Sequence, residues 1–180
     1  PKNPNIVFVA AQGALYGPNK ERGIFKSVDG GVTWNKILYV NNLTGCSELS
    51  MDYNNPLVMY AAMWEHQRLP WKVISGGPGS GLYKTTDGGV TWNQIHNGLP
   101  KEKGKMAVAV SRSNSEKVYA LVESDSNKEL GGLFVSNNAG INWSKISSDH
   151  SLIQRAWYYI ELFIDPTDEE KVYVLNASAQ

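Results

Sequence analysis

The sequence lacks the features that mark several common protein classes. It has a single cysteine, Cys46, so no disulfide can form within its 180 residues and no oxidising compartment is needed for one. It has no run of about 18 apolar residues, which argues against a transmembrane helix. Its 17 basic and 17 acidic residues are scattered and balanced, so no basic stripe favours nucleic acid as a partner.

Motifs for metals and activated nucleophiles are also missing. His66, His96 and His150 stand singly, without an HxH or HExxH pattern, and no GxSxG motif is present. Cys46 begins a segment whose pattern predicts a buried strand, and we interpret this cysteine as a small core residue. The sequence therefore predicts neither a metal site nor a cofactor.

What the sequence does contain is a short phrase that occurs three times. It reads SVDGGVTW at 27–34, TTDGGVTW at 85–92 and SNNAGINW at 136–143. These starting positions are spaced as expected for four-stranded propeller blades. The repeat therefore predicts an all-β chain.

Each fixed position of the phrase suits a tight turn between two antiparallel strands. The carboxylates of Asp29 and Asp87 can accept hydrogen bonds from nearby backbone N–H groups, and Gly31 can take a positive φ. In the third copy Asn138 keeps an acceptor, so we expect the turn to persist with weaker anchoring. We assign a structural role to twelve repeat residues: Ser27, Asp29, Gly31, Trp34, Thr85, Asp87, Gly89, Trp92, Ser136, Asn138, Gly140 and Trp143.

This phrase resembles the Asp-box, or BNR, repeat, whose families include sialidases, some endoglucanases and the luminal propeller of sortilin. Longer stretches at 9–34, 60–92 and 154–166 resemble a bacterial group of large sortilin-like exoproteins, and the likeness covers nearly the whole chain. The resemblance implies a β-propeller and a secreted, periplasmic or cell-surface location. The glycosyl hydrolase label often given to this group is based on the presence of the repeat.

A second repeated phrase sets the order of strands within a blade. Turn chemistry followed by a β-rich run occurs at 3–12, 55–64, 115–124 and 169–178, and we name this run strand B. Strand A precedes it. Strand C, at 23–27, 81–85 and 132–136, leads into the repeated turn, and strand D begins with the last two residues of the phrase, at 33–37, 91–95 and 142–146. The predicted architecture is a β-propeller of four-stranded antiparallel blades, present as a partial ring.

This ring comprises about three blades and part of a fourth. The predicted blades are 1–38 without an inner strand, 46–96, 105–147, and one beginning at 158. We expect the chain to be a fragment whose parent supplies the remaining blades, because open sheet edges are a liability that closed propellers avoid. An obligate oligomer of partial rings is the alternative.

Blade topology places the repeated turns on one face and the longer loops on the other. The B-to-C loops are predicted at 12–22, 64–80 and 124–130, and the D-to-A loops at 39–45, 96–104 and 147–157. Long ordered loops are often functional. Lys20, Glu21 and Arg22 lie in one of them, and we interpret them as a solvated or salt-bridged turn.

Two of these segments carry candidate ligand-binding residues. They are Trp64, His66, Arg68 and Trp71 in the first, and Arg155, Trp157 and Tyr158 in the second. Aromatic rings suit sugar faces or extended peptide, and Arg155 could hold a carboxylate. The alternative is structural, with Trp64 and Trp71 packing on a neighbouring blade, Arg68 paired with Glu65, and Arg155 joining two blades.

The sequence supports a binding function more directly than a catalytic one. Glycoside hydrolysis needs two carboxylates across the scissile bond, and Glu21, Glu48, Glu65 and Asp149 are candidates that nothing in the sequence pairs. A sialidase would also need an arginine motif before the first repeat, which is missing. We therefore predict a module that binds peptide, protein or glycan. A polysaccharide hydrolase and a purely structural role are the alternatives.

Overall fold

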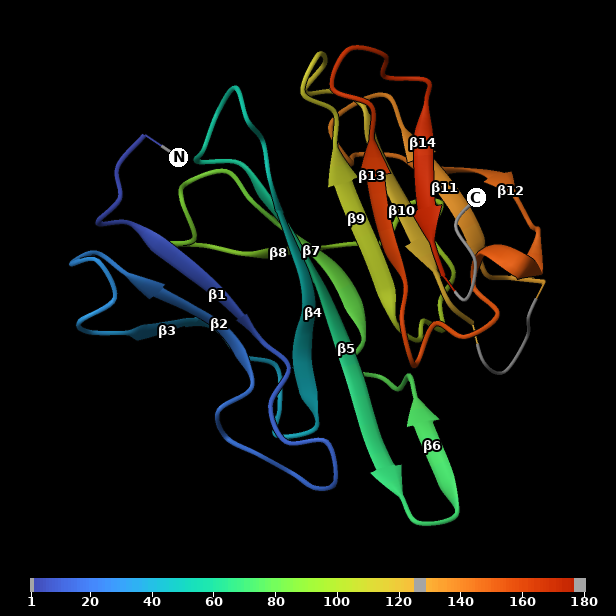
Figure 1. Cartoon of the computed structure of the whole chain (residues 1–180), viewed down its shortest axis with the longest axis horizontal. Helices are drawn as coiled ribbons and strands as arrows, with labels where there is room; N and C mark the ends of the chain where they lie inside the picture. The colour runs from blue at the N-terminus through green and yellow to red at the C-terminus, as the bar shows by residue number, and fades with distance from the viewer. Residues whose placement is uncertain (1, 125–128, 177–180) are drawn as a thin grey trace.

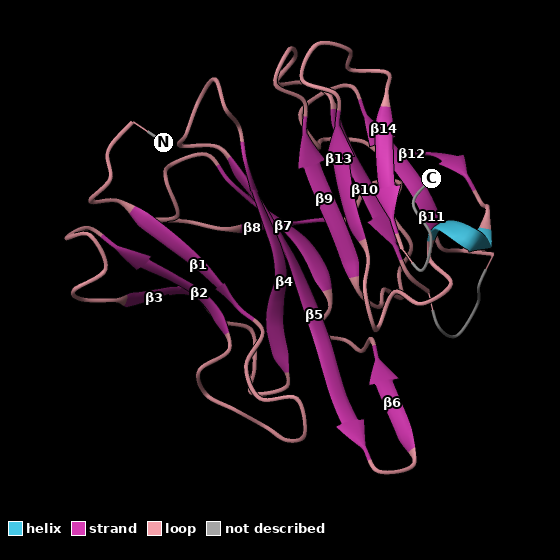
Figure 2. Cartoon of the chain, viewed as in Figure 1, coloured by secondary structure: helices cyan, strands magenta, loops and turns pink. Residues whose placement is uncertain are grey.

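The computed structural model describes residues 2–124 and 129–176, and these form an almost entirely β structure (Figures 1 and 2). The strands are β1 (Val7–Ala11), β2 (Gly23–Ser27), β3 (Asn35–Leu38), β4 (Thr44–Met51), β5 (Met59–Leu69), β6 (Lys72–Ser75), β7 (Gly81–Thr85), β8 (Asn93–Ile95), β9 (Met106–Val110), β10 (Val118–Val122), β11 (Gly132–Ser136), β12 (Ser144–Ser147), β13 (Glu161–Ile164) and β14 (Val172–Leu175). One short 3₁₀ helix, η1 (His150–Leu152), precedes β13. No helix in this described part is both long and apolar enough to cross a bilayer.

The strands form four antiparallel sheets that follow one another along the chain. Their orders are β1-β2-β3, β4-β5-β7-β8, β9-β10-β11-β12 and β13-β14, and β6 pairs only with β5. Successive sheets meet through their innermost strands, with β4 packed beside β9 and β9 beside β13. The predicted fold class is confirmed, and we refer to these sheets as blades one to four.

The core lies between the blades because the second strands of blades two and three, β5 and β10, place apolar residues on both faces. In β10, Val118, Ala120 and Val122 face blade two, whereas Tyr119 and Leu121 face blade four. The period of two that places alternate side chains on opposite faces of a strand explains this division. One strand therefore contributes to two cores.

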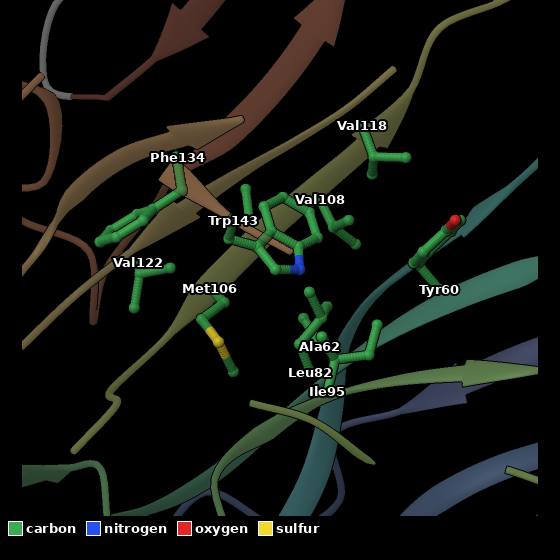
Figure 3. Packing of buried hydrophobic residues seen from close by; sticks show 11 residues of the cluster. Tyr60, Ala62, Leu82, Ile95, Met106, Val108, Val118, Val122, Phe134 and Trp143 are labelled. Atoms are coloured by element: carbon green, nitrogen blue, oxygen red, sulfur yellow. The ribbon is translucent and has the colours of Figure 1, made fainter. Parts of the chain in front are cut away.

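One of two equally large hydrophobic clusters fills the interface between blades two and three. Figure 3 shows Tyr60, Leu82 and Ile95 from blade two meeting Val108 and Trp143 from blade three. A second cluster joins blade three to blade four, and a smaller one joins blade one to blade two. Cys46 belongs to the smaller cluster and is buried. Burial raises the pKa of its thiol to about 12, so it is an inert core residue.

The second repeated turn shows how the phrase closes a blade between strands C and D. The Asp87 carboxylate accepts hydrogen bonds from Thr85 Oγ1 at 2.7 Å, from the Val90 and Thr91 backbone N–H groups at 2.9 Å, and from Thr91 Oγ1 at 2.6 Å. Thr85 Oγ1 in turn accepts the Gly89 N–H at 3.0 Å. These bonds favour the ionised carboxylate, with the Thr91 hydroxyl foremost, and lower the pKa of Asp87.

The other two copies keep the same pattern of hydrogen bonds, with a carboxylate as acceptor in the first copy and an amide in the third. Thr33 donates to Asp29 through its hydroxyl and its backbone N–H, which lowers the pKa of Asp29 to about 2. In the third copy Asn138 Oδ1 accepts the Ser136 hydroxyl and the Asn142 N–H, both at 2.9 Å. Each turn therefore has a side-chain acceptor that organises the backbone.

Each later turn also packs on the blade before it. Lys26 Nζ of blade one donates to the Gly88 carbonyl of the second turn at 2.9 Å. Lys84 Nζ and the Tyr60 hydroxyl of blade two both donate to the Ala139 carbonyl of the third turn at 2.7 Å. The lysine one residue before the end of strand C, Lys26 or Lys84, thus connects one blade to the next.

Two predicted boundaries are corrected by the structure. Strand D was expected to begin with the repeated Thr–Trp or Asn–Trp pair, but β3, β8 and β12 begin after the tryptophan, because that pair belongs to the turn. The expected loop 64–80 is instead largely a hairpin. β5 runs on to Leu69 and returns as β6, which forms the arm at the bottom of Figure 1. Parts of the expected loop 124–130 and of the expected strand 169–178 lie outside the described residues.

Replacing the second-turn carboxylate tests this account of the turns. Asp87→Ala removes an acceptor for four donors, so we expect the melting temperature of the full chain to fall by about 3 °C or more. Asp87→Asn should cause a smaller fall, because Asn138 supplies an equivalent acceptor in the third turn. Equal losses in the two variants, measured by thermal unfolding, would contradict this account.

Candidate functional site

Five of the seven residues predicted to bind a ligand line one pocket at the face opposite the repeated turns. Its volume is about 180 Å³. The lining residues are Gln12, Leu15, Trp64, His66, Gln67, Arg68, Val73, Ile74, Lys105, Trp157 and Tyr158. The β5–β6 hairpin forms one wall, and the segment before β13 forms the other. Two segments far apart in the sequence thus come together.

The hairpin wall is positioned by backbone pairing on both sides of β5. On one side β5 pairs with β6 from His66↔Ser75 to Leu69↔Lys72. On the other side the His66 N–H donates to the Leu43 carbonyl at 3.1 Å and the Arg68 N–H to the Leu15 carbonyl at 2.9 Å. This wall therefore belongs to the sheet and is not a free loop.

An aromatic stack forms the inner end of the pocket. The rings of Trp64 and His66 lie 4.2 Å apart, nearly parallel, and Lys105 Nζ lies 5.5 Å from the Trp64 ring centroid. Trp64 Nε1 donates to Ser75 Oγ at 3.1 Å, which ties the indole to β6. Both rings are almost fully buried, so they form a rigid surface.

Arg22 holds this end of the pocket in place from behind. Its side chain is fully buried and donates to the carbonyls of Leu43 at 2.7 Å, Ala14 at 2.6 Å and Gly17 at 3.2 Å. It also donates to His66, at the carbonyl and at Nδ1. The prediction of a solvated or salt-bridged turn is wrong for Arg22, because backbone carbonyls replace water and acidic partners around it.

The contact with Arg22 determines which ring nitrogen of His66 carries the proton. A guanidinium can only donate, so Nδ1 at 3.0 Å must accept, and the ring proton is on Nε2. A carbonyl lies 3.4 Å from the same Nδ1, but that longer contact would need the proton there. Burial, and then the charge of Arg22, lower the pKa of His66 to about 4. His66 is therefore neutral at pH 7, and its Nε2 has no partner within the described residues.

The outer part of the pocket joins the two walls through Arg68 and Trp157. The guanidinium carbon of Arg68 lies 5.4 Å from the Trp157 ring centroid, within the range of a cation–π contact. Tyr158 meets Trp157 edge to face at 6.1 Å and is largely exposed. Trp71 is 77% exposed, and neither it nor the exposed Arg155 lines this pocket.

The alternative pairing of Arg68 with Glu65 does not occur. Glu65 Oε2 instead accepts the Gly79 N–H at 2.8 Å, and the Glu65 N–H donates to Ser80 Oγ at 2.9 Å. A Cβ at Gly77 would lie 2.4 Å from Glu65 Oε1, so a larger residue there would displace this carboxylate. The glycine-rich run at 76–81 thus surrounds the Glu65 carboxylate, which belongs to the same sheet.

Two carboxylates on the inner strands interact electrostatically. Burial first, and repulsion from Glu161 second, raise the pKa of Glu48 to about 8. Glu48 lies on β4 and Glu161 begins β13, and both also act electrostatically on the partly buried Lys105. Glu48 was among the acids predicted from sequence, whereas Glu161 was not, because it reads as part of an apolar strand. At neutral pH the pair holds a proton on Glu48.

The remaining predicted acids do not join this pair. Glu21 is exposed, and Asp149 caps η1 by accepting the Ser151 N–H at 2.9 Å. No group of three or more His, Cys, Asp or Glu side chains in the described ranges could hold a metal ion. The chemistry available at this face is therefore that of aromatic rings, cations and one carboxylate pair.

Comparisons with known proteins show likeness of fold to larger enzymes. A scan of protein-family models finds no match, and a search of curated proteins finds none. Among solved structures, the GH74 xyloglucanase from Xanthomonas campestris matches 84% of this chain at TM-score 0.59 and 19% identity, and the GH74 enzyme of Niastella koreensis matches 94% at 0.61 and 24%. An ancestral GH74 enzyme matches the whole chain at 0.65 and 18%. The chain spans 22%, 25% and 24% of these three proteins, respectively.

Substitution of the buried arginine tests its role behind the pocket. Arg22→Lys cannot reach the same carbonyls with a planar fork of donors, so we expect a loss of about 2 to 4 kcal/mol in unfolding free energy. Amide hydrogen exchange should accelerate at His66 and Arg68, whose N–H groups bond the segments that Arg22 joins. The exposed Lys20, changed to Gln, is the matched control, and a similar loss there would refute this role.

The carboxylate pair predicts how stability depends on pH. The Glu48 pKa is about 8 in the folded chain against an ordinary 4.5, so its contribution is intact below pH 4.5 and is lost as the pH rises to about 8. Glu48→Gln removes this loss. At pH 9 the variant should unfold with about 2 kcal/mol more free energy than the wild type, less than the full pKa difference implies because the group is partly solvated. At pH 4.5 the two proteins should not differ, and a constant gap across this range in denaturant titrations would exclude the shift.

Proposed function

We propose that this chain is the ligand-binding part of a larger β-propeller protein. The ligand, a glycan or a peptide, is held at the face opposite the repeated turns, between the β5–β6 hairpin and the segment before β13. The observation that carries this proposal is the contact between Arg68 and Trp157, which brings two sequence-predicted segments into one aromatic and cationic pocket.

The division of the molecule into two faces supports a binding role. One face has short turns whose polar side chains are used in their own hydrogen bonds, as Asp87 is. The other has the projecting hairpin, the pocket and exposed aromatic side chains such as Trp157 and Tyr158. Exposed aromatic residues beside a pocket are typical of recognition surfaces.

The proposal extends to family and location. We infer that the chain is an Asp-box repeat protein of the sortilin-like bacterial exoprotein type, with the predicted blade boundaries, and that its parent is secreted or displayed at the cell surface. The three copies of the repeat and the fold support this inference. The three GH74 structures reported above are about four times as long as this chain, which agrees with a parent protein longer than the chain.

A second candidate function is the hydrolysis of a polysaccharide. The proximity of Glu48 and Glu161, with a proton held on Glu48 at neutral pH, favours it, because glycosidases use one protonated and one ionised carboxyl group. A reducing-sugar release assay on polysaccharides tests it. Release that stops in both Glu48→Gln and Glu161→Gln would establish hydrolysis, whereas no release from the wild type would exclude it for the substrates used.

Removing the aromatic wall tests the binding role. Trp157→Ala deletes the indole against which Arg68 lies, so we expect the affinity for any ligand of this face to fall at least about tenfold. Ligands are first found with a glycan and peptide array probed with the full chain, and affinities are then measured by calorimetry.

The matched control is Trp71→Ala, which removes an exposed indole from the tip of the same hairpin, outside the pocket. This variant should bind as the wild type does. If Trp157→Ala bound every array ligand with unchanged affinity, the proposed site would be wrong.

A further inference from the structure

The lining of the pocket combines donors and cations with no acid. Arg68 and Lys105 supply two positive charges, and His66 supplies a neutral ring whose proton is on Nε2. No Asp or Glu side chain is part of this lining, and the remaining polar groups are two glutamines and the Tyr158 hydroxyl. A pocket of this composition is complementary to a ligand rich in acceptors.

Arg68 is the cation most available to a ligand. Within residues 2–124 and 129–176 its guanidinium makes no ion pair and no hydrogen bond, although its backbone N–H is bonded to Leu15. Its contact with Trp157 is with an aromatic ring and not with a hydrogen-bond acceptor, so its N–H fork carries no hydrogen bond there. A fork of this kind binds a carboxylate in two parallel hydrogen bonds.

Lys105 and His66 reinforce the same preference at the inner end. Lys105 is partly buried near Glu48, Glu123 and Glu161, but it forms no ion pair with a described residue. His66 is 2% exposed, and its Nε2–H meets no acceptor in the described chain. Both groups therefore make the inner end of the pocket rich in donors and positive charge, which complements a ligand with acceptors.

The shape of the site favours a sugar ring over a peptide. A volume of about 180 Å³ is small, and exposed Trp157 and Tyr158 rings flank it. Peptides that bind along sheets need unpaired backbone groups, but the N–H groups of His66 and Arg68 on this wall are already bonded to Leu43 and Leu15. Aromatic faces beside a pocket suit the C–H face of a pyranose.

We propose that this pocket binds a hexuronate residue of an acidic oligosaccharide, with its carboxylate held by Arg68, its acceptors near Lys105 and His66, and its ring against the aromatic side chains. This assignment rests on the proposed binding function and specifies its ligand. It uses Arg68 where the sequence pointed to Arg155 as the carboxylate-binding residue.

Calorimetry with matched oligosaccharides tests the assignment on the full chain. The probes are trigalacturonate, a glucuronate trimer, the methyl ester of trigalacturonate, and neutral cellotriose. We expect at least one acidic trimer to bind, and the methyl ester to bind at least about tenfold more weakly than trigalacturonate if trigalacturonate binds, because the ester keeps the rings and loses the charge. A tripeptide with a free C-terminus and its amide form test the peptide source of a carboxylate.

Variants then identify the cation. Arg68→Gln should weaken binding of the acidic trimer at least about tenfold and leave the melting temperature close to that of the wild type. Lys72→Gln removes an exposed positive charge from the same hairpin, outside the pocket, and should leave the affinity unchanged. Equal effects of the two variants would mean a diffuse electrostatic attraction and would overturn the assignment.

The remaining outcomes separate this inference from the proposed function. If neither acidic trimer binds, if the ester binds as well as the acid, or if only the free-terminus tripeptide binds, the hexuronate assignment is wrong. The binding function would still stand if a neutral sugar or a peptide bound and lost affinity in Trp157→Ala. If no array ligand depended on Trp157, both would fail.

Discussion

The arrangement of the whole molecule depends on the hydrogen-bonded turn between strands C and D. An acceptor at its centre, Asp29, Asp87 or Asn138, fixes the path of the backbone. With that path set, the later turns present a carbonyl to a lysine of the preceding blade. The turn thus closes its own sheet and, in blades two and three, positions that sheet on the preceding one, where the inner strands β4 and β9 pack side by side.

The opposite face is organised by a different interaction. Arg22 is buried among carbonyls of three segments, and its contact with Nδ1 orients the His66 ring beside Trp64. Burying a guanidinium is costly unless its donors are satisfied, so the segments that surround it are constrained together. The pocket beside Arg68 is therefore a consequence of the blade framework and of this buried cation.

The fold was predictable because its turns have specific local chemistry. β2, β7 and β11 coincide with the predicted phrases, since the polar turn after each sets where the strand must end. The β5–β6 hairpin was not predictable, because Pro70 lies at its turn and the glycine-rich run 76–81 follows it, so the whole stretch reads as loop.

At the candidate site, sequence identified the types of residue but not their partners. Only the fold brings Arg68 to Trp157, and nothing near Glu161 or Arg22 in sequence indicates a carboxylate pair or a buried guanidinium.

The β5–β6 hairpin projects beyond its sheet, so its sequence can change during evolution independently of the packing between blades. Its residues past Glu65 pair with β6 and with two neighbouring segments, while the interfaces between blades are made further along the strands, by residues such as Tyr60 and Ala62. Changes of length or composition at the tip therefore leave the packing between blades untouched. A single scaffold of this kind can acquire new specificities by exchange of one arm, as an antibody domain does by exchange of its loops.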